Sequence, residues 1–327
     1  MSDVIRRQII ELYNSPEYIS LSSYYGRRSC MDILGIARRE DAHSNFLAWL
    51  LNPRENHGLQ SYAVQKLLHL LVMAKNEYSC NHSAPFEKNF QDMLLVEDFK
   101  IKDVLVNREF MPSDKKDSRM DILLEITFYE DSRAYPIILE NKVKSGEHGS
   151  QSDRYYDWGQ KKYADKSKYA EPLYVFLSPR IDFSLIDETG RGKICKNPNY
   201  LLINYQNIVD YILEPCRKKG MSPDANFLVS DYLRCLSYSD IAKKDGDLIM
   251  AYSAEEKTLL RQFWNKNSHL LLMTIDALCS DDEIDDSDKE KMRKAVDVLE
   301  NHRDTRKYLF NGREYGKSRL VEAVVNA

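Results

Sequence analysis

Hydrophobic residues follow a helical period at the start of the chain. Between residues 41 and 51 the apolar side chains recur at the spacing of one helix face, and residues 59–74 repeat this pattern after a break at Pro53 and Gly58. The spacing predicts that residues 1–78 are mainly helical.

The period changes to that of β-strands in the middle of the chain. Four aliphatic or β-branched runs are bounded by turn-type residues, and we expect each to form a strand: residues 104–111, 119–129, 135–143 and 171–179. A polar segment with helical spacing, residues 150–164, precedes the fourth run. From about residue 204 onward the helical period returns.

The order of these elements predicts a mixed α/β fold. We expect a central four-stranded mixed sheet flanked by helices, followed by an all-helical C-terminal extension. The predicted limits are residues 1–203 for the α/β core and residues 204–327 for a mainly helical region packed on it.

Composition narrows the classes of protein. The 327 residues are 43% hydrophobic, enough for a well-formed core, and the net charge of −4 means that any nucleic-acid contact must come from a local patch. The six cysteines form no Cys-x-x-Cys pair, which argues against a thiolate zinc site or a disulfide scaffold. No apolar run approaches the roughly 20 residues of a membrane span, so we expect a cytoplasmic protein without membrane contacts.

Two opposite charges lie at the end of the third predicted strand. Glu140 and Lys142 are two positions apart and therefore fall on one face of the strand. If the second and third strands form a hairpin whose turn is centred between residues 130 and 131, Asp121 lies opposite Glu140, with Cβ atoms about 5 Å apart. A shift of one residue in register would undo this placement.

A carboxylate pair at this position needs a physical reason. Like charges directly opposite each other destabilise a sheet, and buried charges are costly unless they are paired or bound to an ion. A divalent cation between Asp121 and Glu140 would remove the repulsion. Two alternatives stay open, since the carboxylates can be solvated at a strand end and Lys142 can serve only as an ion-pair partner.

Three short motifs, in this order, resemble those of the PD-(D/E)XK nuclease superfamily. They are "RMDILLEI" with Asp121, "IILENKV" with Glu140 and Lys142, and "QSDRYYDW" with Gln151 and Tyr155. The corresponding pattern is an Asp on the second core strand, a Glu-x-Lys on the third, and a Gln-x-x-x-Tyr on the helix that follows.

The resemblance covers about residues 35–180 and departs from the pattern at Met120, which stands where a proline is usual. It implies a restriction-endonuclease-like core. It also implies a site for Mg²⁺ or Mn²⁺ formed by Asp121, Glu140 and the main-chain carbonyl of Asn141.

The resemblance further implies roles for helical residues. Glu40 matches a helical Glu that often joins the metal site, although a charged helix start favoured by the helix dipole would also explain it. Gln151 and Tyr155 are implied to orient Lys142 or a substrate phosphate, with an ordinary helix surface as the alternative. His43 lies on the same helix face as Glu40, and we interpret it as a hydrogen-bonded structural residue in preference to a residue supporting the metal site.

The resemblance implies metal-dependent hydrolysis of phosphodiester bonds in nucleic acid, foremost DNA, in a prokaryotic defence or restriction-like system. Lys142 would orient the attacking water or stabilise the charge that grows on the phosphate, and one or two metal ions both remain open. The competing hypothesis is a catalytically inactive nuclease-fold module that binds nucleic acid or a partner protein. A third is a helical scaffold whose C-terminal half binds a partner protein. A homodimer or a partner protein bound through the C-terminal helices is also open.

Overall fold

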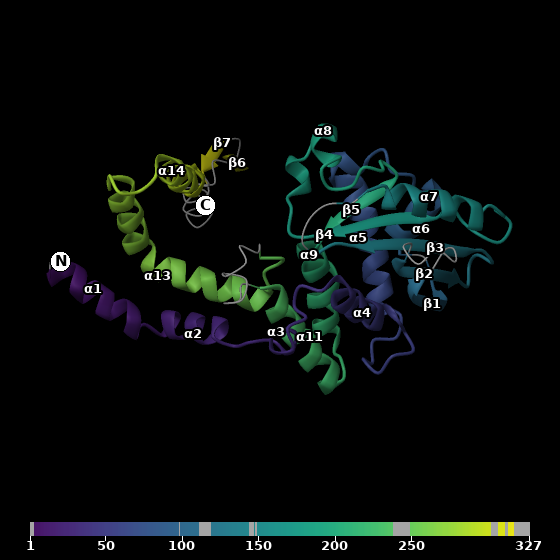
Figure 1. Cartoon of the computed structure of the whole chain (residues 1–327), viewed down its shortest axis with the longest axis horizontal. Helices are drawn as coiled ribbons and strands as arrows, with labels where there is room; N and C mark the ends of the chain where they lie inside the picture. The colour runs from purple at the N-terminus through teal and green to yellow at the C-terminus, as the bar shows by residue number, and fades with distance from the viewer. Residues whose placement is uncertain are drawn as a thin grey trace. The chain divides into compact units, whose positions relative to one another are not determined.

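The computed structural model describes residues 3–97, 99–110, 119–143, 147, 149–237, 249–301, 307–310 and 313–316. The chain divides into two compact units, and each is described by itself. One unit comprises residues 20–259 and holds the sheet; the other comprises residues 1–19 and 260–327 (Figure 1). The limits expected from the sequence, at residues 203 and 204, stay a prediction.

The larger unit is built on a five-stranded mixed sheet whose spatial order follows the chain. Its strands are β1 (Ile101–Phe110), β2 (Met120–Phe128), β3 (Ala134–Asn141), β4 (Leu173–Ser178) and β5 (Tyr200–Asn204). The first three strands pair antiparallel, and the last three pair parallel. The four expected strands are confirmed, but the expectation of a four-stranded sheet is wrong by one strand.

Sequence periodicity did not predict the additional strand, β5, and the reason is physical. All five of its residues are buried, so the run shows no alternation of apolar and polar positions. It also continues directly into a helix, because Asn204 and Asn207 cap that helix through reciprocal side-chain to backbone bonds of 2.9 Å. A short, fully buried run that ends in a helix cap is not distinguished from helix by its period alone.

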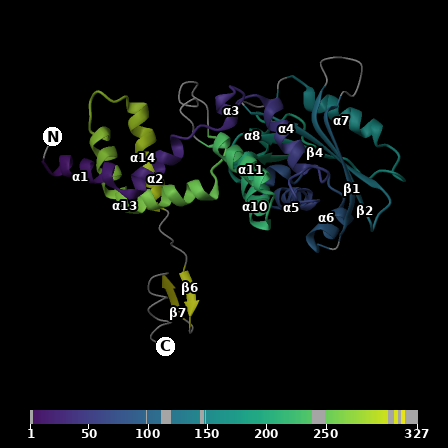
Figure 2. The ribbon, with the colours of Figure 1, turned by 90° about the horizontal axis from the view of Figure 1, so that it is seen from below.

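Helices cover both faces of the sheet. Figure 2 shows the strands between α7 (Gln151–Lys162) on one side and α5 (Tyr62–Glu77) and α6 (Lys88–Leu95) on the other. On the α5 side, the leucines and valines of the helices and the inward residues of the strands form one apolar cluster, which also includes α4 (Glu40–Leu51). On the α7 side a second cluster is rich in tyrosine.

The approach of α7 to the sheet depends on a glycine. A Cβ atom at Gly159 would lie 2.9 Å from Cδ1 of Ile138 on β3 and would also clash with the hydroxyl of Tyr174 on β4. Only a residue without a side chain lets the helix lie this close to the two central strands. Gly159 thereby lets the second half of α7 pack directly on the two central strands.

The remaining helices of the larger unit are short or lie after the sheet. They are α2 (Pro16–Tyr25), which begins in the other unit, α3 (Cys30–Ile33), η1 (Ser79–Asn81), η2 (Phe183–Leu185), α8 (Glu188–Arg191), α9 (Tyr205–Ile208), the π-helical turn η3 (Val209–Leu213), α10 (Glu214–Lys219) and α11 (Pro223–Leu236). Apolar residues of α9 to α11 join the cluster on the α5 side of the sheet.

The other unit is helical with one exception. It contains α1 (Asp3–Asn14), most of α13 (Ala254–Cys279) and α14 (Asp286–Asn301), and also an antiparallel pair, β6 (Lys307–Phe310) with β7 (Arg313–Gly316). The expected helical C-terminal extension is confirmed in its main part, but it is not all-helical because it also contains this strand pair. The sequence between these strands, Asn311-Gly312, is a dipeptide that favours a two-residue hairpin turn. The prediction of an all-helical extension did not take it into account.

Of the helices that the structure describes, none combines the length and the apolar character needed to cross a lipid bilayer.

Candidate active site

Two carboxylates face each other across neighbouring strands. Ile122 of β2 pairs with Leu139 of β3, so the next pair in this register is Asp121 with Glu140. This is the register that the turn position predicts. Leu123, two positions after Asp121, and Ile138, two positions before Glu140, both belong to the cluster on the α7 side, and residues two apart on a strand point to the same face. The two acidic side chains therefore converge at one end of the sheet.

Glu140 is buried and paired with a cation. Only 1% of the residue is exposed, and its Oε1 lies 2.8 Å from Nζ of Lys142, which is 7% exposed. Neither carboxylate oxygen of Glu140 has a partner that meets hydrogen-bond geometry among the described residues. Asp121 is only half-buried, and its Oδ2 accepts a bond of 2.7 Å from the main-chain N–H of Asn141.

A third carboxylate comes from the helix α4. Glu40 is its first residue, and its Oε2 lies 3.3 Å from Nζ of Lys142, while its Oε1 accepts from the N–H of Val143 at 3.4 Å. The ammonium group of Lys142 therefore lies between a carboxylate of the sheet and one of the helix. These charges come from parts of the chain that are 100 residues apart.

Burial and neighbouring charges set the protonation states of Asp121, Glu140 and Lys142. Burial raises the pKa of Asp121 to about 6, although the Asn141 N–H and the Lys142 ammonium act against the rise. Burial, and then the neighbouring Asp121, also raise the pKa of Glu140 above its usual range. Burial alone would lower the pKa of Lys142, but Glu140 and the other two carboxylates raise it, so the ammonium stays charged at neutral pH.

The side chain of Asn141, between the two charged residues, is a hydrogen-bonded junction. Its Nδ2 donates to Oγ of Ser44 at 3.0 Å and to the carbonyl of Glu40 at 3.4 Å, and its Oδ1 accepts from the Tyr205 hydroxyl at 2.6 Å. Together with its N–H bond to Asp121, these contacts tie β2, α4 and α9 to the end of β3. Sequence reasoning assigned no role to Tyr205, since nothing local marks a residue 64 positions from its partner.

We expect Tyr205→Phe to lower the free energy of unfolding by about 1–3 kcal/mol, because it leaves the buried Oδ1 of Asn141 without a donor. Urea unfolding measures this loss. Tyr211→Phe is the matched control, because Tyr211 is 41% exposed and the same hydroxyl is removed. Equal, small effects of both substitutions would contradict the role of the Tyr205 bond.

The two residues of the Gln-x-x-x-Tyr motif lie on α7, and Tyr155 is buried. Nε2 of Gln151 donates to the Tyr155 hydroxyl at 2.9 Å, and that hydroxyl donates to the carbonyl of Arg119. Within the described part of the chain, no hydrogen bond joins either residue to Lys142. Their contacts hold the start of β2, two residues before Asp121, and their implied role toward Lys142 or a phosphate stays a prediction.

His43 fits the structural interpretation. Its Nδ1 lies 3.0 Å from the Tyr232 hydroxyl and its Nε2 lies 3.0 Å from the carbonyl of Ala37. Burial lowers the pKa of His43 to about 4, so the ring is neutral at physiological pH. Both ring nitrogens have partners away from the carboxylates.

The donor set suits a hard divalent cation. Asp121, Glu140 and the main-chain carbonyl of Asn141 offer oxygen atoms only, the ligands that Mg²⁺ and Mn²⁺ prefer, and Mg²⁺ needs few protein ligands because it keeps several waters. The buried Oε2 of Glu140, which has no partner in the described part of the chain, is an acceptor that such an ion would satisfy. The described residues contain no group of three His, Cys, Asp or Glu side chains arranged to hold a metal. The ligand roles of Asp121, Glu140, Asn141 and Glu40 therefore stay predictions.

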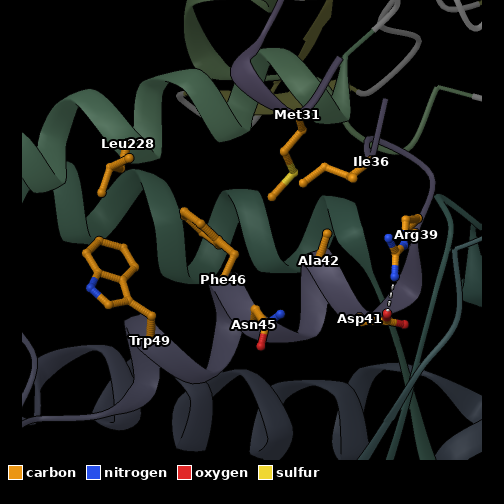
Figure 3. A pocket seen from close by; sticks show the side chains of 9 residues that line it. All are labelled: Met31, Ile36, Arg39, Asp41, Ala42, Asn45, Phe46, Trp49 and Leu228. Carbon is orange, nitrogen blue, oxygen red and sulfur yellow. Dashed lines mark hydrogen bonds and ion pairs between the residues drawn. The ribbon is translucent and has the colours of Figure 1, made fainter. Parts of the chain in front are cut away.

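The opposite face of α4 borders an open groove with a volume of about 470 Å³. Figure 3 shows Phe46 and Trp49 of α4 in this groove, with Leu228 of α11 across from them and the ion pair of Arg39 with Asp41 at its end. Its lining is mainly apolar and contains none of the converging charges. The groove and the charged site are therefore separate features of one helix.

Comparison with known proteins identifies one family. Residues 30–234, more than half of the chain, match the model of the PD-(D/E)XK nuclease superfamily. The matched segment contains the whole five-stranded sheet. It also contains every predicted site residue: Glu40, Asp121, Glu140, Asn141, Lys142, Gln151 and Tyr155. Neither a curated protein nor a solved structure matches the chain.

Proposed function

The chain belongs to the PD-(D/E)XK nuclease superfamily, and from this premise we propose that it is a metal-dependent nuclease that cleaves phosphodiester bonds in DNA. By the resemblance of its Gln-x-x-x-Tyr motif, we also propose that it acts in prokaryotic defence. The observation that carries the proposal is the convergence of Asp121, Glu140 and Lys142 at one end of the sheet.

The cost of this arrangement supports a catalytic use. A buried ion pair is often no more stable than apolar residues of the same size, so Glu140 and Lys142 have no evident value as a purely structural pair. The half-buried Asp121 adds a second negative charge beside Glu140 and raises the repulsion. A fold that needed only stability would be better served by aliphatic residues at these positions.

The residues divide the chemistry among them. Asp121, Glu140 and the Asn141 carbonyl would hold Mg²⁺ or Mn²⁺, which when bound supplies Lewis-acid stabilisation of the phosphate and a more acidic water. Lys142 presents a permanent positive charge that can donate to a phosphate oxygen or orient the attacking water. Glu40 keeps the ammonium group of Lys142 in place through its 3.3 Å contact.

The test is cleavage of defined polymers by the full chain. We expect cleavage of plasmid, linear or single-stranded DNA with Mg²⁺ or Mn²⁺ and none with EDTA; an RNA substrate in parallel decides between the two polymers. Gel electrophoresis of end-labelled products shows whether the cut is internal. Binding without cleavage at any metal concentration would overturn the proposal and favour the inactive nuclease-fold module.

We expect the affinity for Mg²⁺ or Mn²⁺ to rise with pH through about 6, the pKa of Asp121 in the metal-free protein. A protonated carboxylate cannot hold the ion, so below that pKa the affinity falls by up to about tenfold per pH unit for each proton displaced. Isothermal titration calorimetry with Mn²⁺ between pH 5 and pH 8 measures the slope. An affinity that does not change over this interval would contradict the assignment of Asp121 as a ligand.

A further inference from the structure

Two arginines share one carboxylate beside the candidate active site. Arg108 and Glu109 are near the end of β1, and Arg119 directly precedes β2. Nη2 of Arg108 lies 3.0 Å from Oε1 of Glu109, and Nη1 of Arg119 lies 2.8 Å from the other oxygen, Oε2. One carboxylate thus bridges two guanidinium groups from neighbouring strands, and the three side chains carry a net charge of one positive unit.

The backbone at Glu109 departs from the strand to make this bridge. Arg108 pairs with Ile122 and Phe110 pairs with Met120, so position 109 falls opposite Asp121. Glu109 has a φ of 49°, in the left-handed region that non-glycine residues rarely adopt. A regular strand would set Glu109 against the catalytic carboxylate, and like charges in that position repel. Strained positions of this kind concentrate at functional sites.

Arg108 is positioned more firmly than a surface arginine. Its Nη1 donates to the carbonyl of Asp41 at 2.8 Å, in the first turn of α4 beside Glu40, and 18% of its side chain is exposed. Its Nε is buried and has no hydrogen-bond partner among the residues that the structure describes.

Both arginines lie close to Asp121, one along the chain and one on the neighbouring strand. Arg119 is two residues before Asp121, and two steps of extended backbone correspond to about 6.6 Å between Cα atoms at ~3.3 Å per residue. Arg108 is on the adjoining strand, and its charge favours the ionised form of Asp121. A polymer held at the carboxylates continues past them, and its next phosphate would meet the positive charge of these two arginines.

We propose that Arg108 and Arg119 form a binding site for a backbone phosphate of the nucleic-acid substrate, next to the scissile phosphate, and that Glu109 takes the place of this phosphate in the free protein. The inference rests on the proposed nuclease function, because it assigns the ligand from the reaction at the adjoining carboxylates. Arginine suits the task, since its planar guanidinium donates two parallel bonds to a phosphate and stays charged at all relevant pH values.

Exchange of the carboxylate for a phosphate is inexpensive. The Glu109 side chain is 43% exposed and that of Arg119 is 57% exposed, and ion pairs at such positions contribute little to stability. Glu109 can therefore turn to solvent when the polymer binds. The contact would not depend on the base sequence. Phosphate contacts position a bound strand, whereas contacts to the bases give sequence specificity.

The experiment is a salt titration of binding without turnover. The full chain is mixed with a fluorescently labelled DNA duplex or single strand in EDTA, and the dissociation constant is measured by anisotropy at several NaCl concentrations. We expect Arg119→Ala to weaken binding about fivefold to tenfold and to reduce the slope of log affinity against log salt by about 0.7–0.9, the value of one phosphate contact. Arg54→Ala is the matched control: Arg54 makes an equally exposed ion pair with Asp103 at the far end of β1.

The variant Glu109→Gln separates a phosphate site from a purely structural ion triad. If Glu109 competes with the substrate, the Glu109→Gln variant binds DNA about threefold more tightly than the wild type. If Glu109 instead holds the two arginines in place, the same variant binds DNA more weakly. Weaker binding by Glu109→Gln, or a slope for Arg119→Ala equal to that of Arg54→Ala, would overturn the inference. In that case wild-type cleavage with Mg²⁺ would still stand, so the two proposals fail by different observations.

Discussion

Asp121→Asn is expected to lower the rate of DNA cleavage by about 10³-fold or more while the protein remains folded. The change removes the negative charge from one side of the metal site but retains a side-chain oxygen that can accept from the N–H of Asn141, 2.7 Å away in the wild type. Loss of a group that stabilises the transition state by about 4 kcal/mol corresponds to a factor of this size. Cleavage of end-labelled DNA at saturating Mg²⁺ measures the effect.

The matched control is Asp157→Asn, which removes the same charge from an exposed position of α7. It is expected to cleave at the wild-type rate. Calorimetry with Mn²⁺ should show that Asp121→Asn has also lost affinity for the ion. Full activity of Asp121→Asn would remove the basis for a metal held by this carboxylate, whatever the control shows.

Lys142→Met is expected to be inactive and also less stable by about 3–5 kcal/mol, the cost of leaving a buried charge without its partner. The ammonium group lies 2.8 Å from Glu140 and 3.3 Å from Glu40, and methionine fills a similar volume without charge. Without the cation, the pKa of Glu140 rises further, because burial then acts without opposition.

The stability deficit of Lys142→Met should depend on pH in a defined direction. A carboxyl whose folded pKa lies above its unfolded value contributes stability at low pH that is lost as the pH rises through the folded pKa. The deficit should therefore be smaller at pH 5 than at pH 8. Urea unfolding at these two values tests the direction, and a deficit that is larger at pH 5 would refute it.

The double variant Lys142→Met with Glu140→Gln distinguishes the two effects. With both charges of the buried pair removed, most of the lost stability should return, because no uncompensated charge remains. Cleavage should not return, since the cation and a metal ligand are both missing. A stable but inactive double variant would show that the pair is kept for chemistry.

Local periodicity was sufficient to predict most of the larger unit. The strands that alternate or carry long aliphatic runs were predicted within a few residues, and the turn position alone set Asp121 opposite Glu140. Both results follow from short-range geometry: side chains alternate along a strand, and a hairpin turn fixes the register of its two strands. β5 was missed because a short, uniformly buried strand has no period to detect.

Residue spacing predicted the candidate site only as far as neighbouring strands define it, and the family resemblance added Glu40, Gln151 and Tyr155 without their contacts. That Glu40 meets Lys142, and that Ser44 and Tyr205 hold the side chain of Asn141, depends on how α4 and α9 pack against the end of the sheet. The bridge from Glu109 to Arg108 and Arg119 depends on a single left-handed backbone angle that no periodic pattern encodes.

The amino-acid order therefore specifies which residues are inside, which face each strand residue takes, and which charges end together on a hairpin, because these properties depend on neighbours a few positions away. The partners of those charges come from segments about 60 to 100 residues distant. Which of many distant polar groups meets them is decided by the packing of whole helices against the sheet, and only the three-dimensional structure records that outcome.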